Sequence, residues 1–428
     1  MLNQNDFEIR KLGECRIPSP MKGVHFTGDH EHILFHRELE TLQEYLDKEI
    51  APPRFEAAGP REKIFFDPDR LACGIVTCGG LCPGINDVIR SIVLSLHYHY
   101  GVNEIYGFRY GYQGLVPEYG HEPVLLTPQL VNPINEVGGT ILASSRGNQD
   151  VSVMVETLVR MKIGILFAIG GDGTQRGALA ISEEIQRRGL KISVIGIPKT
   201  IDNDVSFVQK TFGFETAVSQ AKDATYAAHI EATGAPNGIG LVKLMGRDSG
   251  FIAAYSVLVD NHVNFCLIPE VPFTMEAFLE ALRQRMVLRG HAVIVVAEGA
   301  GQDLFARTGE KDASGNLKYG DIGLYLRDAI KAYFKDLGIG INLKYIDPSY
   351  TIRSQPANPH DSAFCLLMGQ SAVHAGMAGR TGMIVGYWNN LYTHVPIGLA
   401  VSRRKKIDPK GWLWNSILAS TGQPVRMV

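Results

Sequence analysis

Two short acidic turns contain the residues of this chain that are best suited to chemistry. The first is GGDGT at residues 170–174, which contains Asp172, and the second is PKTIDND at residues 198–204, which contains Asp202 and Asp204. Carboxylates bind Mg²⁺ together with phosphate oxygens and water, and a carboxylate can accept the proton of an attacking hydroxyl. A single aspartate in such a turn is as often only a helix N-cap, worth about 1 kcal/mol of helix stability. Two acidic turns are harder to explain as capping alone.

The elements around these turns predict that both turns lie at one edge of a sheet. Apolar runs at residues 165–169 and 192–197 precede the turns, and residues 178–188 have apolar side chains at helical spacing between them. This pattern is a strand, a crossover helix and a second strand, so the two strands should be parallel neighbours. Open α/β sheets bind ligands at the carboxyl edge of their strands. We therefore expect Asp172 and Asp202 to face one cleft.

Two further turns have the composition of phosphate-binding loops. A predicted strand at residues 72–77 runs into CGGLCPGIN (78–86), which opens a helix at 88–96 and exposes backbone N–H groups. Because the turn lacks Gly-Lys-Ser/Thr, a P-loop is disfavoured. The sequence GGTILASSRG (138–147) places Arg146 in a turn of small residues, where its planar guanidinium could clamp a phosphate. An ordinary surface arginine is an equally good interpretation of Arg146 at this point.

The alternation of strands and helices continues to the C-terminus. It predicts α/β architecture, and a break near Ser206 indicates a second sheet. The N-terminal segment (1–70) contains an amphipathic stretch at 39–50 and is interpreted as an arm that packs on the main body or on a neighbouring subunit. Strands are predicted at 238–244, 264–268, 292–297 and 383–387, helices at 251–259, 275–288, 322–337 and 362–378, and an exposed loop at 301–320.

Length and composition limit the possible classes of protein. A chain of 428 residues is long enough for two or more domains, and its net charge of −2 without a long basic run argues against a nucleic-acid partner. The basic cluster at residues 403–406 favours a solvated loop. Six cysteines are too sparse for a disulfide scaffold. The N-terminus lacks the apolar core of a signal peptide and no stretch could span a bilayer, so we expect a cytoplasmic protein without a membrane partner.

From about Leu71 onward, the chain resembles the 6-phosphofructokinases. The matching segments stand in family order: TCGGLCPGIN, GYQGL, GGTILASSR, GGDGT, PKTIDND, MGRDSG, AEG and KYIDPSYTIR. GGDGT also occurs in NAD kinases and lipid kinases, whereas TIDND followed by MGR is specific. The resemblance implies the α/β phosphofructokinase fold, with two Rossmann-like three-layer lobes and an N-terminal extension. The implied parts are the extension (1–70), a donor-binding lobe (71–205, completed by about 380–410), a sugar-phosphate lobe (206–379) and a C-terminal segment that packs back (411–428).

The resemblance also implies a reaction, which is phosphoryl transfer from ATP to the 1-hydroxyl of D-fructose 6-phosphate in glycolysis, with Mg²⁺ as cofactor and in a homo-oligomer (tetramer or dimer). Asp202 would be the base, Arg146 and Gly79 would contact the transferring phosphoryl group, and Asp172 would bind Mg²⁺. The residues implied to bind the donor are Gly79, Tyr112, Arg146, Gly171, Asp172, Gly173, Thr174 and Lys199. Those implied to bind the sugar phosphate are Thr200, Asp204, Met245, Gly246, Arg247, Glu298, Lys344, Tyr350 and Arg353.

Two residues give opposite indications of the phosphoryl donor. Pyrophosphate-using members of the family typically have Asp directly after the GGD aspartate and Lys directly before TIDND, whereas common ATP-using members have Gly at both positions. This chain has Gly173, the ATP form, and Lys199, the pyrophosphate form. A missing side chain at position 173 leaves room for the nucleotide, so we expect ATP as the donor. A pyrophosphate-dependent enzyme is the alternative.

Two rival functions predict other residues. A GGDGT kinase that acts on NAD or a lipid has no need of TIDND or MGR. A catalytically silent subunit should have lost Asp172, Asp202 or Arg247, and this chain retains all three. Gly238 stands where many phosphofructokinases have an arginine that reaches a neighbouring subunit's site, which argues against substrate binding across subunits in this protein.

Overall fold

The computed structural model of the protein describes residues 3–306, 309–310 and 317–428, and these form two compact units. Both units are α/β, with a mainly parallel sheet between layers of helices, which confirms the predicted fold class. No helix in the described part of the chain is both long enough and apolar enough to cross a bilayer. Unit 1 comprises Met1–Thr200, Val205–Gly213 and Gln355–Arg403, and unit 2 comprises Ile201–Asp204, Phe214–Ser354 and Arg404–Val428.

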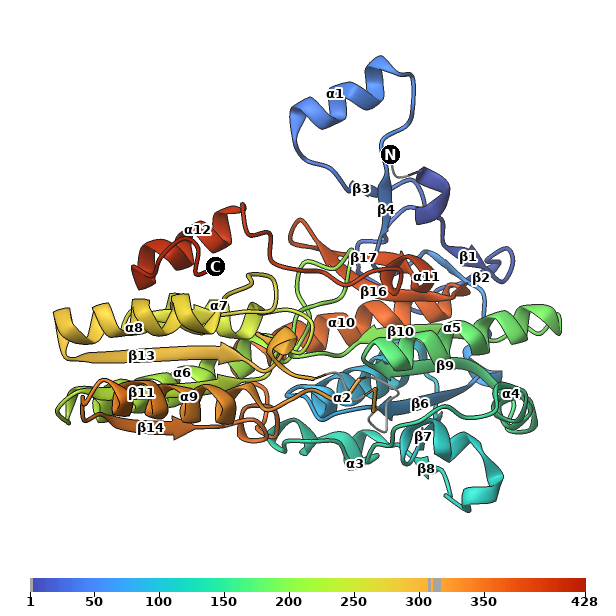
Figure 1. The fold of residues 1–428 in the computed structure, drawn as a ribbon. Helices are drawn as coiled ribbons and strands as arrows, with labels where there is room; N and C mark the ends of the chain where they lie inside the picture. The colour runs from blue at the N-terminus through green and yellow to red at the C-terminus, as the bar shows by residue number, and fades with distance from the viewer. Residues whose placement is uncertain (1–2, 307–308, 311–316) are drawn as a thin grey trace. The chain divides into compact units, whose positions relative to one another are not determined.

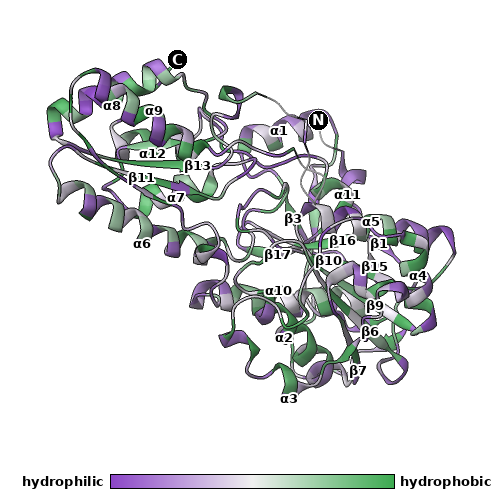
Figure 2. Ribbon diagram, turned by 60° about the horizontal axis from the view of Figure 1, so that its bottom comes forward, coloured by the Kyte–Doolittle hydropathy of each residue, from purple (hydrophilic) through white to green (hydrophobic). Residues whose placement is uncertain are grey.

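Unit 1 is built on a nine-stranded sheet with a parallel centre (Figure 1). The strand order is β3-β4-β17-β16-β10-β9-β6-β7-β8, and the strands from β16 to β7 in this order run parallel. The central strands are apolar along almost their whole length, as is typical of strands covered on both faces (Figure 2). The strands are β3 (His32–Leu34), β4 (Arg54–Ala57), β6 (Ala72–Cys78), β7 (Glu104–Phe108), β8 (Val124–Leu125), β9 (Ile163–Gly170), β10 (Ser193–Pro198), β16 (Met383–Trp388) and β17 (Leu391–Pro396).

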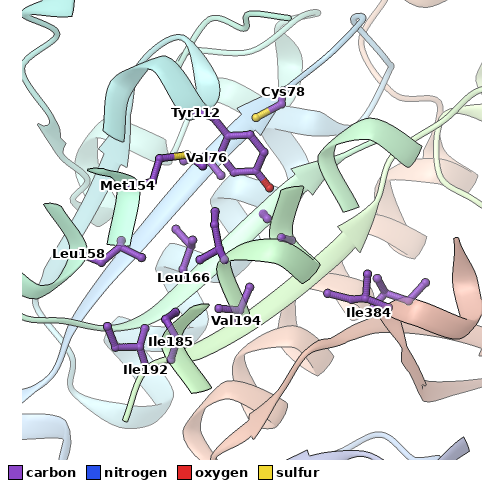
Figure 3. Close-up of a cluster of buried hydrophobic side chains, with 14 of the residues drawn as sticks. Val76, Cys78, Tyr112, Met154, Leu158, Leu166, Ile185, Ile192, Val194 and Ile384 are labelled. Atoms are coloured by element: carbon purple, nitrogen blue, oxygen red, sulfur yellow. The ribbon is translucent and has the colours of Figure 1, made fainter. Parts of the chain in front are cut away.

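Helices cover both faces of this sheet because its side chains alternate in direction. On β9, Leu166 and Ala168 belong to the buried cluster that includes residues of α4 (Val151–Arg160) and α5 (Asp172–Arg187), part of which is drawn in Figure 3. The intervening Ile165 and Phe167 lie against Gly376, near the end of α10 (Pro359–Met377). The helix after the first Gly-rich turn is α2 (Ile85–Ser95), which packs with α10. These helices confirm the predicted crossover after β9 and the predicted helices near 88–96 and 362–378.

The N-terminal segment, which ends at Arg70, packs on the body of unit 1. Its strands β3 and β4 extend the main sheet beyond β17, and β1 (Arg10–Lys11) pairs with β15 (Arg380–Thr381). A separate ladder joins β2 (Ile17–Pro18) to β5 (Lys63–Ile64). The predicted amphipathic helix is α1 (Leu39–Asp47), which reaches away from β3 and β4 in Figure 1. Its apolar residues Leu39 and Leu46 are exposed.

Unit 2 contains a four-stranded parallel sheet in the order β12-β13-β11-β14. On β11, Ile239 and Leu241 pack in the core formed with α8 and α9, whereas Gly240 approaches Ala228 of α6 on the other face. The elements are β11 (Gly238–Leu244), β12 (Phe265–Leu267), β13 (His291–Ala297), β14 (Asn342–Ile346), α6 (Phe214–Thr233), α7 (Phe251–Val259), α8 (Met275–Arg289), α9 (Ile322–Asp336) and α12 (Trp412–Thr421). Part of the predicted loop at 301–320 lies outside the described residues, and its described part begins with a short 3-10 helix, Gln302–Leu304.

Candidate active site

Three turns begin at the same level on the carboxyl edge of the sheet of unit 1. The parallel registers place both Cys78 of β6 and Pro198 of β10 opposite Gly170 of β9. The Gly-rich turn, the GGDGT turn and the PKTIDND turn therefore leave adjacent strands side by side. This confirms the prediction that the strands before the two acidic turns are parallel neighbours, and it places these turns where open α/β sheets bind ligands.

Asp172 is the first residue of α5, and Gly171 is the N-cap. The Asp172 carboxylate accepts a hydrogen bond from Arg176 Nε at 3.0 Å. A negative charge in the first turn also interacts favourably with the helix dipole. Among the described residues, a Cβ atom added at Gly173 would meet no atom within 4 Å beyond its own turn of α5, so the backbone at the start of α5 borders open space. Asp172 is thus not the N-cap, which removes the capping interpretation for this residue.

Lys199 is buried directly beside the first Gly-rich turn. Its amide donates to Gly170 O at 3.0 Å, and its Nζ donates to Gly80 O at 2.5 Å. The ammonium group would lie 3.7 Å from a Cβ atom at Gly79, so the cation and the glycine turn line the same small region. Because Gly79 N donates to Ser145 O at 3.0 Å, the turn that contains Arg146 also adjoins this region. The structure therefore brings Gly79 and Lys199 together and places the backbone of the Arg146 turn beside them, while the Arg146 side chain is exposed.

Tyr112 lies in the core of unit 1 (Figure 3). Its hydroxyl donates to Thr174 O at 2.7 Å, and burial raises the pKa of the phenol well above its ordinary value. The ring also packs against Gly177 of α5, where an added Cβ atom would lie only 2.6 Å from it. In this arrangement Tyr112 supports the first turns of α5, where Asp172 and Gly173 are located.

The second acidic turn, Ile201–Asp204, groups with unit 2. The Asp204 side chain is buried and accepts a hydrogen bond from Arg404 Nη1 at 2.5 Å. Burial raises the pKa of the Asp202 carboxyl well above its ordinary value, and the charges of Asp204 and Glu298 raise it further, while Arg404 acts in the opposite direction. That Asp172 and Asp202 face one cleft remains a prediction.

The MGR and AEG turns lie side by side at the carboxyl edge of unit 2. Strand register places Leu244 opposite Ala297, so Met245 and Glu298 directly follow neighbouring strand ends. Glu298 N donates to Leu244 O at 2.9 Å, and Gly299 N donates to Gly246 O at 3.1 Å. A Cβ atom at Gly299 would lie 1.8 Å from the carbonyl oxygen of Arg247, so the two turns can approach this closely only with glycine at 299.

The pKa of Glu298 reflects its burial and the charges near it. Burial raises the pKa of its carboxyl, while Arg247, Lys243 and Arg353 are close enough to lower it. The Arg247 guanidinium stacks over the Tyr319 ring at 4.4 Å and donates to Leu317 O. The charges of Arg247 and Arg353 thus act on Glu298, and the roles that the sequence predicts for these three residues stay predictions. This end of unit 2 offers positive charge beside a partly buried carboxylate, which suits a phosphorylated polyol.

Tyr350 and Lys344, the other two predicted residues of the KYIDPSYTIR segment, are both exposed. The exposed Tyr350 ring packs under the Arg353 guanidinium, at 4.9 Å, just before the 3-10 helix Thr351–Arg353. Lys344 is exposed in the middle of β14, opposite Gly240 of β11. It lies on the strand itself, two residues before the end of β14, whereas Arg353 lies in the 3-10 helix that follows.

Sequence reasoning missed several residues at the edge of unit 2. Lys243, on β11, forms ion pairs with Asp321 at 3.0 Å and Asp347 at 2.8 Å. The prediction that residues 403–406 form a solvated loop was wrong for two of the four residues, because Arg404 and Lys405 contact the acidic turn. No local pattern in the sequence indicates the contacts of Arg404 and Lys405, since their partners lie about two hundred residues earlier in the chain.

Comparison with known proteins identifies the family. A family model described as Phosphofructokinase matches residues 72–376. The chain belongs to the phosphofructokinase family. An ATP-dependent 6-phosphofructokinase of Borreliella burgdorferi is 52% identical, with 99% of this chain and 98% of that protein covered. One of Trypanosoma cruzi is 45% identical, with 97% and 87% covered.

Solved phosphofructokinases have the same fold. A pyrophosphate-dependent phosphofructokinase of Marinobacter aquaeolei matches with a TM-score of 0.66 at 22% identity, over 79% of this chain and 86% of that one. A phosphofructokinase of Pichia pastoris in the T-state matches with a TM-score of 0.63 at 21% identity, over 87% of this chain and 38% of that one. At these identities the likeness establishes the fold alone.

Proposed function

We propose that this protein transfers the terminal phosphoryl group of ATP to the 1-hydroxyl of D-fructose 6-phosphate, giving fructose 1,6-bisphosphate and ADP, a reaction of glycolysis. The proposal is supported by relatives that are named ATP-dependent 6-phosphofructokinase and that match almost the whole chain at 45–52% identity. The observation that carries the choice of ATP is the open space beside Gly173, where a Cβ atom would meet no described atom within 4 Å beyond its own helix turn.

The donor would bind at the carboxyl edge of unit 1. Three kinds of group support this assignment, namely the backbone of the glycine turns, the buried Lys199 ammonium and the exposed Arg146 guanidinium. Tyr112 would act indirectly, because its hydroxyl bonds to Thr174 and holds the start of α5. The residues proposed for donor binding are Gly79, Tyr112, Arg146, Gly171, Asp172, Gly173, Thr174 and Lys199.

A phosphofructokinase needs a divalent metal, and we propose Mg²⁺. The donor set fits this ion, because Mg²⁺ binds one or two carboxylates and completes its shell with phosphate oxygens and water. Asp172 presents a carboxylate at the strand edge, next to the backbone that would hold the phosphates. When bound there, Mg²⁺ would neutralise charge on the donor phosphates.

The sugar phosphate would bind at the edge of unit 2. Arg247 and Arg353 would hold the 6-phosphate, and Glu298 would accept a hydrogen bond from a sugar hydroxyl. Met245 and Gly246 would position Arg247. Thr200, Asp204, Lys344 and Tyr350 complete the proposed set, although Lys344 lies in mid-strand.

Asp202 would act as the base. Its carboxylate would accept the proton of the sugar 1-hydroxyl while that oxygen attacks the terminal phosphorus of the donor. Because the transition state of phosphoryl transfer is loose, the placement of the hydroxyl contributes more than the strength of the base. Arg146 and the backbone at Gly79 would stabilise the charge on the transferring group.

Measuring kcat/KM with ATP and with pyrophosphate, at saturating fructose 6-phosphate, tests the proposed donor. We expect turnover with ATP and little with pyrophosphate. A clear preference for pyrophosphate would favour the alternative function, for which Lys199 is the supporting residue. Turnover of NAD in place of fructose 6-phosphate would refute both.

We also propose that the protein is a homo-oligomer, either a tetramer or a dimer. The supporting observation is a set of exposed apolar side chains, Leu39 and Leu46 on α1 and Ile50 just after it, which are 72%, 60% and 46% exposed. Light scattering of the purified protein tests this proposal. A monomer at micromolar concentration would contradict it.

A further inference from the structure

A short segment near the C-terminus, residues 404–407, holds the second acidic turn by hydrogen bonds. We call this segment the 404–407 strap. Arg404 Nη1 donates to Asp204 Oδ2 at 2.5 Å, and the amide of Lys405 donates to Asp204 O at 2.9 Å. The Lys405 ammonium donates to Asn203 Oδ1 at 2.9 Å. Side chains and backbone of the strap therefore bind two successive residues of the turn.

The same strap is attached to the segment that follows the MGR turn. Ser249 Oγ donates to Lys405 O at 3.0 Å, and the Lys405 ammonium lies 5.1 Å above the ring of Phe251. The Glu270 carboxylate joins both sides, because it accepts hydrogen bonds from Gly250 N at 3.1 Å and from Ile407 N at 3.0 Å. All these residues belong to unit 2. The strap thus connects the acidic turn to the MGR turn, although neither is near it in sequence.

The ion pair at the acidic turn is largely buried. The turn it contacts also contains a residue with an unfavourable backbone conformation. The Asp204 side chain is only 3% exposed, and that of Arg404 is 34% exposed. Removing one partner of such an ion pair leaves a buried charge with less compensation, which is more costly than breaking a surface pair. Asn203 has a φ angle of +53°, in the left-handed region that non-glycine residues seldom occupy. Its bond to Lys405 helps to hold it in that conformation.

We propose that Arg404 and Lys405 are positioning residues for phosphoryl transfer, which hold the turn that contains Asp202 at a fixed place relative to the MGR turn. The inference rests on the proposed function, in which Asp202 is the base and Arg247 binds the sugar phosphate. Arg404 and Lys405 hold the turn through their hydrogen bonds to Asp204 and Asn203. The charge of Arg404 also acts on Asp202 itself, in the direction that lowers its pKa. A displacement of about 1 Å between reacting groups can reduce the rate by about 10²-fold.

Steady-state kinetics of Arg404→Met and Lys405→Met test this role. Lys406→Met is the matched control, because Lys406 carries the same charge on the same strap but is exposed. We expect kcat to fall by about 10- to 100-fold in Arg404→Met and Lys405→Met, with the KM for ATP nearly unchanged. Arg404→Lys should recover part of the loss, since it restores the charge but not the planar geometry. Lys406→Met should behave like the wild type.

A double-mutant cycle separates positioning from a general loss of structure. If Arg404 acts through Asp204, Arg404→Met should slow an Asp204→Asn enzyme by no more than about twofold, because the contact is already lost. Independent, multiplicative effects on kcat would overturn the inference, as would an Arg404→Met enzyme equal to the Lys406→Met control. Should Arg404→Met fail to fold, the same cycle with Lys405→Met and Asn203→Ala decides the question. A wild-type enzyme without turnover of ATP and fructose 6-phosphate would instead refute the proposed function.

Discussion

The choice of donor depends on one missing side chain and one buried cation. Gly173 leaves open space at the N-terminus of α5, and Lys199 places its ammonium beside the first Gly-rich turn. The cation can serve the phosphates of either donor, whereas the open space is useful only to a donor larger than pyrophosphate. The steric feature should therefore decide between the two donors.

Gly173→Asp should reduce kcat/KM for ATP by about 10²-fold or more, because a carboxylate would occupy the open space and repel the donor phosphates. Gly340→Asp is the control, since this glycine also has open space around it and lies in unit 2. Kinetics with both donors measure the effect. Unchanged ATP kinetics in Gly173→Asp would contradict the steric argument.

Asp202 should impose a pH dependence on kcat. Burial and the charges of Asp204 and Glu298 raise the pKa of Asp202, and only the ionised carboxylate can accept a proton. Activity should therefore be lost as the pH falls, starting above the range of an ordinary aspartate. Asp204→Asn removes one of the raising charges, so the acidic limb of its kcat profile should move to lower pH. An acidic limb that stays in place in Asp204→Asn would show that another group, such as the substrate phosphate, titrates there.

At the level of the elements, the turns after β11 and β13 are joined to each other by backbone hydrogen bonds. The amide of Gly299 donates to Gly246 O, and the Cα of Gly299 faces the carbonyl of Arg247. The proposed sugar-phosphate ligands Arg247 and Glu298 are therefore placed by backbone contacts between two strand ends. The distance between these two turns depends on Gly299, which itself has no side chain that could bind the substrate.

Gly299→Ala should separate these two turns, because its Cβ would lie 1.8 Å from Arg247 O. We expect kcat/KM for fructose 6-phosphate to fall by about tenfold or more, since overpacking of this kind typically costs about 1–3 kcal/mol. The KM for ATP should change little, because the donor residues belong to unit 1. Gly340→Ala serves as the control. Equal kinetics in the two variants would show that the turns tolerate the displacement.

At the level of the whole molecule, the N-terminal segment is part of the core of unit 1. Arg380 is almost completely buried and donates to Asp29 at 2.6 Å and to Glu56 at 2.9 Å. Arg61 also donates to Glu56, at 2.9 Å. The carboxylates come from the N-terminal segment and Arg380 comes from β15, so this network joins the two ends of unit 1.

Arg380→Met should lower the free energy of unfolding by about 3–5 kcal/mol, because it leaves the buried Glu56 charge with less compensation. It should also make the N-terminal segment the first site of limited proteolysis. Arg187→Met is the control, since Arg187 is exposed and its pair with Glu184 lies at the surface. Thermal unfolding and timed proteolysis measure both effects. An unfolding midpoint equal to that of the control would show that the network does not hold the segment.

Much of the architecture could be predicted from the sequence, because it depends on local patterns. The apolar runs before Asp172 and Lys199, with helical spacing between them, correctly predicted β9, α5 and β10 as a parallel unit. The predicted bounds of β11 and α7 agree with the structure at both ends. Periodicity, glycine turns and proline stops act over a few residues, so they can be read from the chain alone.

Other features were decided only by the tertiary structure. No pattern in the N-terminal segment predicted that β3 and β4 would pair beyond β17, or that Asp29 would bind Arg380. The basic cluster at 403–406 has an ordinary composition, yet two of its residues bind the acidic turn. Such contacts join segments far apart in the sequence, and strand pairing and charge partners at that range depend on which surfaces the folded core brings together. The types of residue that do the chemistry could be read from the sequence, whereas the residues that hold them in place required the fold.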